Sequence, residues 1–168
     1  MANEIRYKLD TAITFSDDTT GGTYTLDCGG LAADAVRISD QADIGITTAN
    51  QEPIKFRWSM VVDGFDTAPV VDETVDVYLA FGRSSSDIDG DIAATDGAGT
   101  TVSLPNMKQI GKCVVQTTTA GNELRASGEV SITSRYVTVV IHNNTVDALL
   151  STSDAHTFTL EGVIPEVQ

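Results

Sequence analysis

The residues whose spacing could do chemistry are the aspartates of the segment Ser86-Asp87-Ile88-Asp89-Gly90-Asp91, where carboxylates recur at every second position. Carboxylate oxygens are the ligands that Ca²⁺ prefers in proteins. The spacing departs from an EF-hand loop, because Gly90 precedes the third aspartate, Asp91, instead of following it, and the twelfth position is Ala98 instead of glutamate. Asp87, Asp89 and Asp91 are therefore the candidate calcium ligands. The alternative is a solvated, turn-rich hairpin, and we predict no resident metal or cofactor.

No catalytic motif accompanies this segment. The Gly-x-Ser-x-Gly turn of serine hydrolases and the Gly-rich phosphate loop are both absent. His142 and His156 are the only histidines, without the Cys/His spacing of a zinc site, and we expect both to be structural. Two of the 24 acidic residues could still meet in space as a carboxylate pair, although nothing in the sequence selects them. We therefore predict that the chain is not an enzyme.

The elements that must position these residues are strands. Large apolar residues recur at every second position in Phe56–Val62 and Val75–Phe81, which gives each strand one buried face. Trp58 lies on the buried face of the first strand. Further strands are predicted at Ile5–Leu9, Ala12–Phe15, Tyr24–Cys28, Ala35–Ile38, Gly111–Gln116, Glu129–Ile132, Tyr136–Ile141 and Thr157–Val163. About ten strands joined by glycine-rich turns favour an all-β fold, an antiparallel β-sandwich of jelly-roll type, with a barrel as the alternative.

The segments between the predicted strands have fewer sequence patterns that indicate a structure. Pro105–Gln109 and Val146–Leu150 could form short helical turns, and Gly82–Leu104 is the longest irregular stretch. No linker divides the chain, so residues 1–168 are predicted to form a single domain, with a possible N-terminal arm and C-terminal tail.

Charge excludes two classes of partner. The chain has 24 acidic and 10 basic residues, a formal charge of −14 that repels nucleic acids and anionic membranes. No stretch approaches the roughly 18 apolar residues of a membrane helix, and the first residues lack a secretory leader, so synthesis in the cytoplasm without export is expected. Cys28 and Cys113 lie in strand-like runs and are expected to be free, buried thiols.

Two tyrosines and one glycosylation motif are candidate surface features. Tyr78 and Tyr136 have the outward parity of their strands. They are candidate exposed contacts for protein or carbohydrate, and burial under a second sheet or a neighbouring subunit is the alternative. Asn143-Asn144-Thr145 matches the N-glycosylation sequence. We expect it to carry no glycan, because the chain is expected not to be exported.

The chain resembles the small virion structural proteins of tailed bacteriophages, of the capsid decoration or cement type. The resemblance rests on the unsignalled N-terminus, the Asp/Gly-rich loop, and three segments: Tyr78-Leu79-Ala80-Phe81-Gly82, Ser134-Arg135-Tyr136-Val137-Thr138-Val139-Val140 and Pro165-Glu166-Val167-Gln168. The resemblance covers most of the chain in its general character and includes no short diagnostic motif.

This resemblance implies a function and a location. Such a protein adds to the major capsid protein of an assembled shell, on the virion surface, often as a homo-oligomer such as a trimer. The residues expected to contact the partner lie in the N-terminal segment Asn3–Lys8, in Gly82–Leu104, in the C-terminal tail and at the two tyrosines. They are Asn3, Ile5, Tyr78, Arg83, Asp87, Asp89, Tyr136, Pro165 and Gln168, and Arg125 could pair with acids of the partner.

The alternative function belongs to a different class: a carbohydrate- or receptor-binding sandwich of a phage tail, fibre or adhesin. It would use Tyr78 or Tyr136 as an exposed aromatic and the acidic loop as a calcium site.

Overall fold

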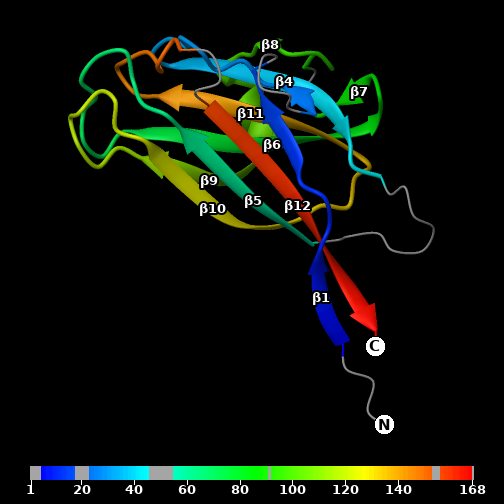
Figure 1. Cartoon of the computed structure of the whole chain (residues 1–168). Helices are drawn as coiled ribbons and strands as arrows, with labels where there is room; N and C mark the ends of the chain where they lie inside the picture. Colours follow the sequence, from blue (N-terminus) through cyan, green and yellow to red (C-terminus); the bar gives the residue numbers. More distant parts are fainter. Residues whose placement is uncertain (1–4, 18–22, 46–54, 91, 153–155, 168) are drawn as a thin grey trace.

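Two β-sheets pack face to face in the computed structural model (Figure 1), which describes residues 5–17, 23–45, 55–90, 92–152 and 156–167, with the backbone alone at 5–8 and 165–167. One sheet, called the β5 sheet, contains β1 (Ile5–Leu9), β2 (Ile13–Ser16), β3 (Tyr24–Thr25), β5 (Lys55–Val62), β10 (Leu124–Ser131) and β12 (His156–Val167). The other, called the β6 sheet, contains β4 (Ala35–Asp43), β6 (Thr74–Ser84), β7 (Asp87–Ile88), β8 (Gly97–Ala98), β9 (Lys108–Val114) and β11 (Tyr136–Asn144).

The order of the strands is that of a jelly roll. Taken along the chain, the eight principal strands are β2, β4, β5, β6, β9, β10, β11 and β12. The β5 sheet arranges the first, eighth, third and sixth of them side by side, as β2-β12-β5-β10, and the β6 sheet arranges the second, seventh, fourth and fifth, as β4-β11-β6-β9. All these neighbours are antiparallel, and only the short β3 runs parallel to its partner. The predicted antiparallel jelly-roll sandwich is confirmed.

The core lies between the sheets, where the alternation places it. Trp58 is 4% exposed and its ring stacks on that of Phe158, with centroids 6.2 Å apart. Phe158 in turn meets Phe15 edge to face at 5.8 Å. The inward face predicted for Phe56–Val62 is therefore confirmed.

The second face of the β6 sheet is buried as well. Ile88 and Leu104, from the stretch that sequence reasoning treated as irregular, pack with Ala80 and Val140 on the outside of this sheet. Coverage on both faces explains why β11 is buried from Val137 to Asn143 without alternation. Gly82–Leu104 is thus not one open loop, because it holds the end of β6, two short strands and the first part of a 3₁₀ helix at Thr101–Asn106.

Several predicted boundaries were wrong. The strand predicted at Tyr24–Cys28 ends at Thr25, and that predicted at Ala35–Ile38 runs on to Asp43. The helical turn expected at Pro105–Gln109 lies earlier, since Lys108 already begins β9. No helical turn forms at Val146–Leu150, where Leu149 instead makes a β-bridge with Phe65.

Both cysteines are free and buried, as their surroundings predict. Burial raises the pKa of Cys113 to about 12 and that of Cys28 further still. We expect neither thiol to react with Ellman's reagent at pH 8 in the folded protein, and both to react after unfolding in guanidinium chloride. Rapid native reaction of either thiol would contradict this burial.

Candidate functional sites

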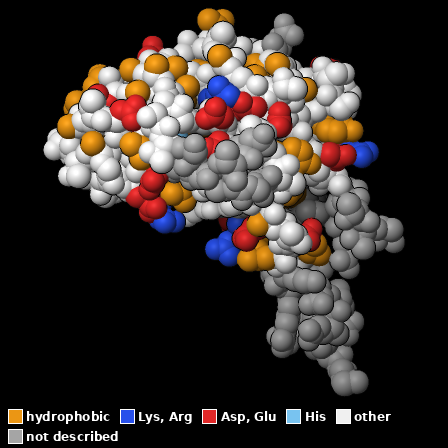
Figure 2. All heavy atoms as spheres, turned by 45° about the horizontal axis from the view of Figure 1, so that its top comes forward, with side chains coloured by type: hydrophobic (Ala, Val, Ile, Leu, Met, Phe, Trp, Pro, Cys, Tyr) orange, Lys and Arg blue, Asp and Glu red, His pale blue; other side chains and the backbone are white. Residues whose placement is uncertain are grey.

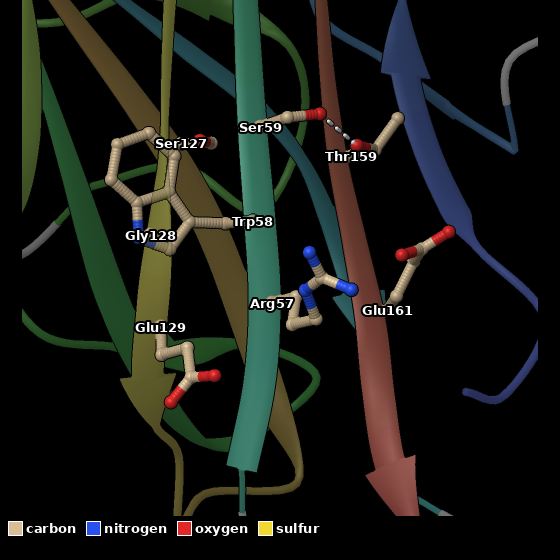
Figure 3. Close-up of a pocket in the computed structure, with 8 residues that line it drawn as sticks. All are labelled: Arg57, Trp58, Ser59, Ser127, Gly128, Glu129, Thr159 and Glu161. Carbon is tan, nitrogen blue, oxygen red and sulfur yellow. Dashed lines mark hydrogen bonds between the residues drawn. The ribbon is translucent and has the colours of Figure 1, made fainter. Parts of the chain in front are cut away.

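A polar hollow of about 350 Å³ lies on the outer face of the β5 sheet (Figure 3). Three neighbouring strands, β10, β5 and β12, supply it with two transverse rows of side chains. One row holds Ser127, Ser59 and Thr159, and the next holds Glu129, Arg57 and Glu161. Trp58 and Gly128, from the register positions between these rows, complete the lining. The six polar residues of the two rows are called the polar trough below.

Arg57 occupies the middle of the trough. Figure 3 shows its guanidinium between Glu129 of β10 and Glu161 of β12. Among the described residues Arg57 makes no ion pair within 4.0 Å and no side-chain hydrogen bond. Ser59 and Thr159 are joined to each other, with their hydroxyl oxygens 2.6 Å apart. The trough therefore presents five unengaged N–H donors beside two unengaged carboxylates.

Sequence reasoning missed the trough. Its residues have the outward parity of three strands far apart in the sequence, and only the strand order brings them together. The signal that was available is the run of polar outward positions in β5, Lys55, Arg57 and Ser59, but this pattern equally describes a solvated face.

The two ends of the chain pair with each other and project from the sandwich as a two-stranded ribbon (Figure 1). Apolar residues stand opposite one another at alternate positions of this terminal ribbon, formed by Ile5–Leu9 and Val163–Val167. The apolar pairs are Ile5 with Val167, Tyr7 with Pro165 and Leu9 with Val163, and the intervening pairs are Arg6 with Glu166 and Lys8 with Ile164. By alternation, the residues of the three apolar pairs share one register parity, and Arg6, Lys8, Ile164 and Glu166 have the other. Because a two-stranded ribbon is marginally stable alone in water, the ribbon is a candidate contact element.

The last strand is longer than the predicted Thr157–Val163 and includes the C-terminal tail. Pro165 lies within β12, opposite Tyr7, and the strand continues to Val167. Proline is tolerated there because, among the described residues, β12 has only β1 beside it at this point, so the missing N–H can fall on the other side. Asn3 and Gln168 lie outside the described residues.

The acidic segment forms a short hairpin between β6 and β7, with Asp87 and Asp89 exposed around a buried Ile88. Asp91 lies outside the described residues. In the part of the chain that the structure describes, no three His, Cys, Asp or Glu side chains are grouped to hold a metal ion. The calcium site remains a prediction.

Tyr78 and Tyr136, which have the outward parity of their strands, are both half-buried. Tyr78 is half-buried on the outer side of the β6 sheet, and burial raises the pKa of its hydroxyl. Tyr136 is half-buried too, with the Arg135 guanidinium 5.4 Å from its ring centre. Arg83 is exposed at the end of β6, whereas Arg125 pairs with Glu123 of its own chain, its Nη2 donating to Oε2 at 2.9 Å.

Both histidines are buried and have partners in the chain, as the structural interpretation predicts. His156 is 3% exposed, and its Nδ1 accepts a hydrogen bond from the backbone N–H of Asp63 while Nε2 donates to the carbonyl of Leu150. Burial lowers the pKa of His156, which favours this neutral form. His142 lies with Nε2 3.0 Å from an Asp34 carboxylate oxygen.

The face of the body seen in Figure 2 is acidic. Figure 2 shows acidic side chains spread over the visible face between small groups of hydrophobic ones, with few lysines or arginines. This distribution agrees with the formal charge of −14. In the described part of the chain, no helix has the length and hydropathy that a membrane crossing requires.

Comparison with known proteins identifies no family. No family model and no curated protein matches the chain. Among solved structures, murine APRIL at pH 5.0 is similar with a TM-score of 0.38 and 11% identity, over 96% of this chain and 99% of that one. A Clostridium thermocellum xylanase 10B structure, with CBM22-1 and GH10 modules and xylohexaose, is similar with a TM-score of 0.35 and 11% identity, over 98% of this chain but 26% of that one. At these TM-scores neither likeness bears on function.

Proposed function

We propose that this chain is a virion structural protein that binds the assembled lattice of a major capsid protein and stabilises it. The observation that carries the proposal is the terminal ribbon, which projects from the jelly roll (Figure 1) and pairs apolar residues at alternate positions. We infer that the partner is a capsid lattice from the sequence resemblance to capsid decoration proteins. The ribbon is the element that can extend to that lattice.

The ribbon is suited to adding onto another protein. Within the described residues β1 pairs on one side only, so its other edge can accept a further strand. A two-stranded ribbon is only marginally stable in isolation. Addition of a strand, or burial of its apolar residues against another protein, would stabilise it.

Binding of this kind stabilises a shell by mass action. A protein that binds the assembled lattice, and not the free subunits, lowers the free energy of the assembled state. A contact of roughly 1,000 Å², about two-thirds apolar, has a gross transfer free energy of about 15 kcal/mol before association costs reduce it. Repetition over the lattice makes even a small net contribution from each copy effective.

The test is cosedimentation with shells that lack this component. We expect the unchanged protein to bind saturably and to raise the disruption temperature of the shells. The double variant Ile5→Asn/Val167→Asn, which makes one apolar pair polar without changing the charge, should bind at least tenfold more weakly, because each apolar side chain contributes about 1.5–3 kcal/mol when buried. The matched control is Arg6→Ser/Glu166→Ser, which alters the neighbouring pair and also keeps the net charge.

Two failures can be told apart. Absence of binding by the unchanged protein would rule out the capsid function. Equal binding by both double variants and the unchanged protein would leave that function standing and exclude the ribbon as the contact.

A further inference from the structure

The polar trough is a built arrangement of hydrogen-bonding groups on an open sheet face. Its donors come from Arg57 and its acceptors from Glu129 and Glu161, all three without hydrogen-bonding partners among the described residues. Hydroxyl groups of Ser127, Ser59 and Thr159 form the row beside them. Hydroxyl groups both donate and accept hydrogen bonds. The trough can therefore bind a ligand that has hydrogen-bond donors and acceptors along its whole length.

The trough is elongated. A second hollow of about 270 Å³ adjoins it, shares Ser59 and Ser127 with it, and extends to Val61 and its cross-strand neighbour Arg125. Arg57 and Val61 are four residues apart on β5, which corresponds to about 13 Å at the usual rise of a strand. A chain-like ligand fits such a surface better than a compact one.

Charge narrows the class of ligand. Arg57 stands between two carboxylates, which disfavours an anion at this point, and the chain as a whole carries −14. Conversely, the guanidinium in the middle of the row disfavours a cation. The groups that remain are neutral and rich in hydroxyls.

We propose that the polar trough binds a neutral carbohydrate chain, with Arg57 donating to ring or hydroxyl oxygens and Glu129 and Glu161 accepting from hydroxyl groups. No exposed aromatic side chain lines the trough, so stacking contributes nothing and the affinity is low, with dissociation constants in the millimolar range for a short oligosaccharide. This inference does not depend on binding to a capsid.

The experiment is a titration of the ¹⁵N-labelled chain, followed by NMR, with neutral hexasaccharides of glucose and xylose in α-1,4 and β-1,4 linkage. We expect at least one of them to shift backbone amides of β5, β10 and β12 around the trough. Arg57→Ala should weaken binding about tenfold or more, because it removes hydrogen bonds from a charged donor. Arg83→Ala, an exposed arginine on the β6 sheet, is the matched control and should bind as the unchanged chain does.

A second pair of variants tests the charge argument. Glu129→Gln and Glu161→Gln keep an acceptor oxygen and should retain most of the affinity for a neutral sugar. Loss of binding in both, or tighter binding of a hexauronate than of every neutral hexasaccharide, would overturn the assignment to neutral ligands.

Three further results would overturn the proposal: no amide shifts with any hexasaccharide at 10 mM, shifts confined to another face, or equal binding by Arg57→Ala. Sedimentation velocity of the same samples tests whether the trough instead binds a second copy of the chain. If Arg57→Ala dissociates an oligomer and no sugar binds, the trough is an interface between copies and not a carbohydrate site.

Discussion

Replacing Gly111 with alanine is expected to lower the free energy of unfolding by about 2 kcal/mol. A Cβ atom on Gly111 in β9 would lie 2.4 Å from Cη2 and 2.5 Å from Cζ2 of the Trp58 indole. The ring is 4% exposed and stacks on Phe158, so it cannot move away without displacing a second buried aromatic. Thermal unfolding should show a melting temperature about 4–8 °C below that of the unchanged chain.

The control for this variant is Gly121→Ala, because nothing lies within 4 Å of the Cβ position there. We expect it to change stability by no more than about 0.5 kcal/mol. In a Trp58→Leu background, Gly111→Ala should cost much less, since the smaller side chain leaves room for the methyl group. Equal melting temperatures for Gly111→Ala and Gly121→Ala would mean that the indole does not pack against β9.

Alternation predicted the parts of the fold in which one face meets the core and the other meets solvent. In β5 every second residue is buried, so Phe56 and Trp58 identified both the strand and its inward face. The same reasoning failed near Ile88 and Leu104, because they cover a sheet face that alternation alone would leave in solvent. For that reason Tyr78, which has the outward parity of its strand, is half-buried and not exposed.

The candidate sites were less accessible to sequence reasoning. β1 was predicted as a strand, but its partner, the C-terminal part of β12, was not, because no local signal couples residues at opposite ends of a chain. The polar trough has the same origin, since Arg57, Glu129 and Glu161 become neighbours only through the strand order β10-β5-β12. A sequence contains the residue types of such a site, whereas the topology determines which of them meet.

Asn143 illustrates how a surface motif can be a buried structural element. It opens the Asn143-Asn144-Thr145 sequence, yet its side chain is fully buried. Its Nδ2 donates to the carbonyl oxygens of Leu31 at 2.9 Å and Asp147 at 2.8 Å, and its Oδ1 accepts from the hydroxyl of Thr145 at 2.8 Å. The amide therefore ties the end of β11 to two loops, and attachment of a glycan there would require unfolding.

Asn143→Asp is accordingly expected to lower the free energy of unfolding by about 3–5 kcal/mol, because it buries a charge without a partner. The carboxylate has nearly the shape of the amide but replaces the donor group with an oxygen that faces carbonyl oxygens. Asn143→Ala, which removes the hydrogen bonds without adding a charge, should cost less, about 2 kcal/mol. Thermal unfolding measures both, and the aspartate variant should melt about 10 °C or more below the unchanged chain.

The adjacent residue gives a control for the change of charge. Asn144 is exposed, and its Nδ2 lies 3.4 Å from the Thr74 hydroxyl oxygen, so Asn144→Asp adds the same charge where water can solvate it. We expect a loss of about 0.5 kcal/mol or less. The difference between the two aspartate variants isolates the buried network from the general effect of one more negative charge on an acidic chain. Similar melting temperatures for the two would show that Asn143 is solvated and that its amide does not join these loops.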